Sequence, residues 1–144
     1  PAEAKPEIAG VNVVNNLSSQ QANNQQYLAD GDTSRPWFSH NSSSQELLQP
    51  IDIEIKLKNR AKVSEIDLQG TNEGGLVEVR ATDINNAGGG TVLAQGPFTS
   101  GNTTLKVDNP QEVDTIVIRV LQLPKNSEPG EYPYKATVTE VTIK

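Results

Sequence analysis

The stretch Ile51-Asp52-Ile53-Glu54-Ile55-Lys56-Leu57-Lys58 alternates apolar and charged residues without a break. Successive side chains of a β-strand point to opposite faces of the sheet. The alternation therefore predicts a strand with one face on a hydrophobic core and the other in water. Antiparallel sheets, which often have one solvated face, are the usual setting for such a strand.

Further strand signals lie on both sides of this stretch. Residues 115–123 are nearly all apolar or β-branched and predict a central strand that is buried on both faces. Shorter signals are found at residues 10–14, 63–68, 76–81, 91–94, 103–107 and 134–143. No convincing helix is predicted, although residues 45–49 allow one helical turn and residues 85–90 a Gly-rich hairpin loop. Roughly seven or eight short strands of this kind predict an all-β, antiparallel jelly-roll β-sandwich.

Composition limits the classes of protein that fit. The chain has 144 residues, which suits one domain, and we expect a linker tail at residues 1–9 and a single domain at residues 10–144. A net charge of −6 argues against a nucleic-acid surface. No apolar run approaches the roughly 18 residues of a membrane span. The absence of cysteine and the single histidine exclude thiolate and multi-histidine metal sites.

The last predicted strand contains an irregularity. Ala136 and Val138 share one parity along the chain, whereas Val141 and Ile143 share the other. All four side chains can face one core only if the register changes between the two pairs. The pattern therefore predicts a β-bulge near Thr139-Glu140.

The segment Ala29-Asp30-Gly31-Asp32-Thr33-Ser34-Arg35-Pro36-Trp37 combines an acidic tight turn with the only tryptophan of the chain. Gly31 permits a positive φ. Asp30 and Asp32 can cap backbone N–H groups or bind a hard cation. The segment thus indicates an ordered loop with a carboxylate cluster.

Together with the strands at residues 51–55, 63–68 and 138–143, this segment resembles the discoidin family, also called the coagulation factor 5/8 type C domain. The resemblance extends over roughly residues 10–144. The family belongs to the galactose-binding-like jelly rolls, which include many bacterial carbohydrate-binding modules. The resemblance therefore implies that fold and a binding role.

Many members of this family bind a structural Ca²⁺. Carried over to this chain, the resemblance implies ligands from Tyr27, Asp30, Asp32, position 35, Thr139 and Glu140, with Tyr27 and Thr139 acting through their carbonyls. The family usually has threonine where this chain has Arg35, and a guanidinium can itself neutralise two carboxylates. A Ca²⁺ site and a metal-free, Arg-bridged loop are both open. The second is favoured, so that no cofactor is required.

Six residues are candidates for a ligand-binding rim: Arg35, Trp37, His40, Asn41, Tyr132 and Tyr134. Trp37 either stacks on a sugar or closes the core below its loop, and the core is the more frequent place for a tryptophan in this fold. His40 and Asn41 follow the motif and offer hydrogen bonds to a sugar. The tyrosine pair either faces a ligand or packs against the acidic loop.

Catalysis is not expected. Ser39, His40 and Asp32 are near one another in sequence, but no nucleophile elbow or glycine-rich oxyanion motif surrounds them. Asp and Glu residues are plentiful, and nothing selects one pair for glycoside hydrolysis. The sequence favours a binding domain over an enzyme.

From residue 63 onward the chain also resembles the extracellular C-terminal domain of actinobacterial MviN/MurJ proteins, which are lipid II flippases. The matching features are VEVRATD, TVLAQG, TTLKV, TIVIRVLQLP and ATVTEVTI. This resemblance implies an outer-face domain of a membrane-anchored protein, with peptidoglycan, its precursor or a cell-envelope protein as partner. The alternatives are a carbohydrate-binding module of a secreted or surface protein and a purely architectural protein-contact domain.

Overall fold

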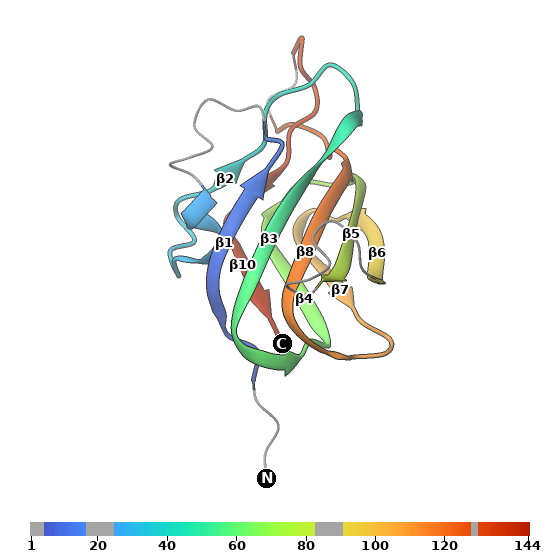
Figure 1. Ribbon diagram of the computed structural model, residues 1–144. Coiled ribbons are helices and arrows are strands. Elements are labelled where there is room, and N and C mark those ends of the chain that lie inside the picture. Colours follow the sequence, from blue (N-terminus) through green and yellow to red (C-terminus); the bar gives the residue numbers. More distant parts are fainter. Residues whose placement is uncertain (1–4, 17–24, 83–90, 128–129) are drawn as a thin grey trace.

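The computed structural model describes residues 5–16, 25–82, 91–127 and 130–144. Its strands form an antiparallel β-sandwich (Figure 1). The larger sheet has the order β1-β3-β8-β5-β6, with β1 Ile8–Val14, β3 Glu46–Lys62, β8 Glu112–Gln122, β5 Gly74–Thr82 and β6 Val92–Phe98. The smaller sheet has the order β10-β4-β7, with β10 Glu140–Ile143, β4 Glu65–Thr71 and β7 Gly101–Lys106. A short ladder pairs β2 (Trp37–Phe38) with β9 (Thr137–Val138).

The alternating stretch forms the middle of β3, as predicted. Ile51, Ile53 and Ile55 are at most 1% exposed and face the smaller sheet, while Glu54 and Lys56 lie on the outer face. Burying an isoleucine side chain fully is worth about 1.5–3 kcal/mol. This repeated burial fixes the strand's register, because a slip of one residue would turn the charged side chains inward.

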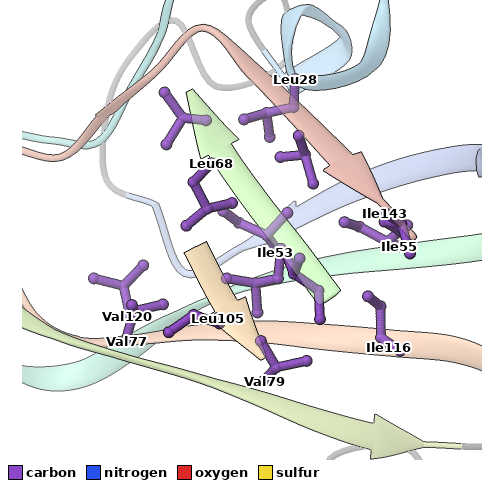
Figure 2. Close-up of a cluster of buried hydrophobic side chains, with 14 of the residues drawn as sticks. Leu28, Ile53, Ile55, Leu68, Val77, Val79, Leu105, Ile116, Val120 and Ile143 are labelled. Atoms are coloured by element: carbon purple, nitrogen blue, oxygen red, sulfur yellow. The ribbon is translucent and has the colours of Figure 1, made fainter. Parts of the chain in front are cut away.

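The prediction of a doubly buried central strand is confirmed by β8, which lies between β3 and β5. Ile116 and Ile118 point into the sandwich, and Val117 on the opposite face is only 4% exposed. Figure 2 shows the aliphatic side chains of both sheets converging between them. Among the buried hydrophobic residues that the structure describes, Trp37 and Phe98 are the aromatic ones, so Val, Ile and Leu fill the core as expected.

The predicted change of register near Thr139-Glu140 is confirmed, as a break between two strands. β9 pairs with β2, whereas β10 pairs with β4, so the two halves belong to different ladders. The side chain of Thr139 lies against Gly70, where a Cβ would come within 2.7 Å of it. Gly70 has φ +75° and lacks that Cβ, which allows β4 to approach the break closely.

Two local predictions differ from the structure. Residues 46–50 belong to β3 and form no helical turn, because the backbone of this segment pairs with β8 (Glu46 opposite Gln122) and the Leu123 N–H donates to the Gln45 carbonyl at 2.8 Å. No helix was predicted at residues 25–29, where the structure has a 3-10 helix, η1 (Gln25–Ala29). The predicted hairpin loop at residues 85–90 lies outside the described residues.

Both ends of the described chain lie at the same end of the sandwich (Figure 1). The Glu7 carbonyl accepts from the Lys58 N–H at 2.9 Å, and the Lys144 carbonyl accepts from the Ser64 N–H at 2.7 Å. The loops that join β2 to β3 and that follow β8 lie at the opposite end. In the part of the chain that the structure describes, no helix has the length and apolarity to cross a membrane.

Candidate functional site

A half-open hollow of about 650 Å³ lies at the loop end of the sandwich, where β3 begins. It is lined by Asn15, His40, Ser42, Ser44, Glu46, Leu47, Leu48 and Gln49, and we call it the His40 hollow. These residues come from the end of β1, the segment after β2 and the first residues of β3. Its volume lies within the range of about 300–1,000 Å³ that is usual for small-molecule sites.

The end of β1 holds two walls of the hollow together. The side chain of Asn16 is buried, donates to the Phe38 carbonyl at 3.2 Å and accepts from the His40 N–H at 2.8 Å. Asn15 donates to the Pro50 carbonyl at 3.3 Å and has a φ of 69°. Asparagine tolerates this left-handed conformation better than most residues. The strained Asn15 backbone and the buried Asn16 amide thus fix the position of His40.

The other side of the segment after β2 is fixed by the chain that leads into β9. The Ser39 N–H donates to the Ala136 carbonyl at 2.9 Å, and the Ser39 hydroxyl accepts from the Ala136 N–H at 2.8 Å. Ser42 and Tyr134 exchange two backbone hydrogen bonds, at 2.9 and 3.2 Å. The hollow is therefore preformed, which lowers the entropy lost when a ligand binds.

The lining combines hydrogen-bonding groups with an apolar surface. Partial burial lowers the pKa of His40 below its ordinary value, so the imidazole is neutral at pH 7. Glu46 supplies a carboxylate, and Ser42 and Ser44 supply hydroxyls. Leu48 is fully exposed, so its side chain offers apolar surface to a ligand. Such a lining can bind a neutral ligand with polar edges and an apolar face.

The predicted rim is only partly assembled around this hollow. His40 lines it, and Asn41 is exposed next to His40. Tyr132 is 51% exposed, whereas Tyr134 is partly buried against the core and pairs with Ser42. Of the two tyrosines, Tyr132 is therefore the more exposed, and neither of them lines the hollow.

Placing Trp37 on the rim is wrong. Its side chain is 0% exposed and belongs to the core between the sheets, so the ring cannot stack on a sugar. The alternative interpretation, that Trp37 closes the core below the loop, is confirmed. Arg35 does not line the hollow, and its guanidinium is held by two carboxylates.

Arg35 bridges the acidic loop. Its Nη2 lies 2.8 Å from Asp30 Oδ2 and its Nε lies 3.0 Å from Asp32 Oδ2. The guanidinium carbon stands 4.8 Å from the centre of the Tyr27 ring, a cation–π distance. Hydrogen bonds from the Ser34 hydroxyl and N–H, together with Arg35, lower the pKa of Asp32. The loop thus carries its own positive charge.

Glu140 joins this loop to the last strand. Its Oε2 accepts from the Gly31 N–H at 3.2 Å, while its Oε1 is buried and has no hydrogen-bond partner in the part of the chain described. Burial raises the pKa of Glu140, and the nearby charges of Asp30 and Asp32 raise it further, against the hydrogen bond from Gly31. The residues that the resemblance implies as Ca²⁺ ligands therefore lie near one another, but Arg35 occupies the carboxylates of the loop.

The geometry does not fit a bound Ca²⁺ while Arg35 keeps these contacts. Within the described ranges, no group of three or more His, Cys, Asp or Glu side chains is arranged to hold a metal ion. Thr139 donates its N–H to the Gln69 carbonyl at 2.8 Å and packs on Gly70. The Tyr27 ring lies against the Arg35 guanidinium.

The sequence reasoning missed most of the lining of the hollow. No role was predicted for Asn15, and residues 46–49 fell in a predicted helical turn. One signal was available: Leu47-Leu48 is an apolar pair among polar residues, immediately before a strand whose inward face was already accounted for by Ile51, Ile53 and Ile55.

Comparisons with known proteins agree on the fold. No protein-family model matches the chain, and no curated protein matches its sequence. Among solved structures, the chain is similar to the CBM32 module of AlyQ in complex with 4,5-unsaturated mannuronic acid, with a TM-score of 0.68, 15% identity and 98% of each chain covered. A pectin-binding carbohydrate-binding module has a TM-score of 0.68 at 13% identity, with 97% of this chain and 92% of that chain covered. The family 32 module of Clostridium perfringens NanJ in complex with galactose has a TM-score of 0.63 at 18% identity, with 93% and 91% covered. At these identities the likeness shows the fold alone, a β-sandwich of the kind found in these modules.

Proposed function

We propose that this chain is a non-catalytic carbohydrate-binding module and that the His40 hollow is its sugar site. The observation that carries the proposal is the preformed hollow itself, with hydrogen-bonding side chains and an exposed leucine on one wall. A pyranose ring has the matching chemistry, since hydroxyls line its edges and C–H groups cover its faces. The similar structures named above include complexes with mannuronic acid and with galactose, which supports a glycan as ligand.

The position of the hollow supports this role. Glu7 and Lys144 lie at the end of the sandwich opposite to the hollow, so polypeptide joined to either end leaves the sugar site open. A module that binds polysaccharide acts where polysaccharide is found, so we propose an extracellular location on a secreted or surface protein.

A narrower setting is the outer domain of a lipid II flippase, with peptidoglycan, its precursor or a cell-envelope protein as partner. The support for this setting is the group of sequence motifs between Val77 and Ile143. The structural comparisons named above support the general role of carbohydrate binding. Binding of soluble peptidoglycan fragments, measured beside plant and animal glycans, would separate the two settings.

Isothermal titration calorimetry with a panel of methyl glycosides tests the proposed function. His40→Ala is expected to weaken binding of the best sugar by roughly three- to tenfold, the value of about one hydrogen bond. Lys106→Ala is the control, because Lys106 is exposed at the opposite end of the sandwich. Absence of binding to every sugar, or equal affinities for wild type and His40→Ala, would contradict the proposal.

A further inference from the structure

The described lining of the His40 hollow has a negatively charged side chain and no lysine or arginine. All twelve lysines and arginines of the chain lie within the described residues, and none of them lines the hollow. The histidine in its wall is neutral at pH 7, because burial lowers its pKa. Among the described residues that line the hollow, Glu46 is therefore the one with a charged side chain, and this charge is negative.

The described lining of this hollow has no cationic side chain that could pair with a carboxylate on the ligand. Proteins bind carboxylates with arginine, which offers two parallel N–H donors, or with lysine. Arg35, the basic residue closest in sequence to His40, is held by Asp30 and Asp32 at 2.8 and 3.0 Å. A bound uronate would instead face Glu46, and this like-charge contact would disfavour acidic sugars.

An uncharged pyranose meets none of this repulsion. Its hydroxyls can exchange hydrogen bonds with His40, Ser42 and Ser44 in the lining, and its C–H face can cover the exposed side chain of Leu48. Covering that side chain removes apolar surface from water, which is favourable at about 25 cal/mol per Å².

We propose that the His40 hollow binds the uncharged pyranose end of a glycan and that Glu46 excludes uronic and sialic acids. This inference rests on the proposed function. Glu46 is then a specificity-determining residue of this chain. The similar pectin-binding module and the module in complex with 4,5-unsaturated mannuronic acid share the fold, so the distinction is made by the lining and not by the sandwich.

The test uses three pairs of methyl glycosides, with gluco, galacto and manno configuration, each pair differing only in CH₂OH or COO⁻ at C6. Wild type is expected to bind the best neutral sugar about fivefold or more tightly than its uronate partner at low salt, as expected for one unit-charge repulsion near the surface. Glu46→Gln, which removes the negative charge, is expected to reduce this ratio severalfold. The melting temperature of Glu46→Gln serves as the control for folding.

The outcomes separate the two proposals. If a uronate binds as tightly as its neutral partner, or if Glu46→Gln leaves the ratio unchanged, the assignment of Glu46 is overturned and the sugar-binding function stands. If no member of any pair binds to either protein, the proposed function itself is overturned.

Discussion

Arg35 carries the positive charge of the acidic loop, in a position where the discoidin domains that the sequence resembles usually have threonine. Its two ion pairs tie Asp30 to Asp32, and its guanidinium lies on the Tyr27 ring. We propose that this side chain takes the place of a structural cation, so that the loop needs no metal. The side chain of Arg35 is half exposed, so each ion pair contributes at most about 1 kcal/mol to stability.

Arg35→Thr is expected to lower the melting temperature by a few degrees and to make it rise again on addition of Ca²⁺, because the freed carboxylates then attract a divalent cation. Wild type is expected to melt at the same temperature with Ca²⁺ and with EDTA. Differential scanning calorimetry measures both. Lys125→Thr, which removes a surface ion pair with Glu73, is the control and should show no response to Ca²⁺. A large rise of the wild-type melting temperature with Ca²⁺ would mean that the metal binds despite Arg35.

The raised pKa of Glu140 predicts that the stability of the fold depends on pH. Its pKa is raised in the folded state, so the folded protein holds this proton more tightly than the unfolded chain. The stability that the fold gains from protonated Glu140 is fully present below the ordinary pKa of 4.5. This contribution is lost as the pH rises through the raised pKa of the folded state. Glu140→Gln should therefore melt above wild type at pH 7, and the difference should shrink towards pH 4. Thermal melts of both proteins across this range check the prediction, and a lower melting temperature for Glu140→Gln at pH 7 would refute it.

At the scale of elements, the sequence predicted those strands whose pattern follows from the burial of one or both faces. The alternation of β3 and the apolar run of β8 both follow from burial and needed no knowledge of their partners. The parity change around Thr139 predicted the break between β9 and β10 for the same reason. Residues 46–50 could not be predicted in this way, because what holds them extended is pairing with β8, some 75 residues later in the chain.

The turn into β5 makes a sharp prediction for one element. Gly75 has φ +69°, and a Cβ there would lie 2.3 Å from the Gln122 carbonyl oxygen of β8. Gly75→Ala is expected to destabilise the fold by about 2–5 kcal/mol, from left-handed backbone strain and overpacking. Gly10→Ala in β1 is the control, because a Cβ there meets nothing within 4 Å. Urea unfolding curves measure both variants, and equal midpoints would contradict this account of the turn.

At the scale of the whole molecule, the two ends of the sandwich differ in what they carry. The chain termini lie at one end, and the His40 hollow lies at the other. The hollow gathers the end of β1, the segment after β2 and the start of β3, which are joined through the buried amide of Asn16. Apart from Leu47 and Leu48 the lining residues are polar, and His40 is the one that was predicted. The site exists only after the long-range pairing is complete.

The most direct test of the sugar-binding account is a two-dimensional ¹H–¹⁵N NMR titration of the labelled domain with the best-binding neutral methyl glycoside. The account predicts that shifts concentrate on the backbone amides of Asn15, His40 and residues 46–49, with Asp32 and Arg35 unmoved. Shifts centred on the acidic loop or on an open sheet face, or no shifts at saturating sugar, would contradict the assignment of the His40 hollow.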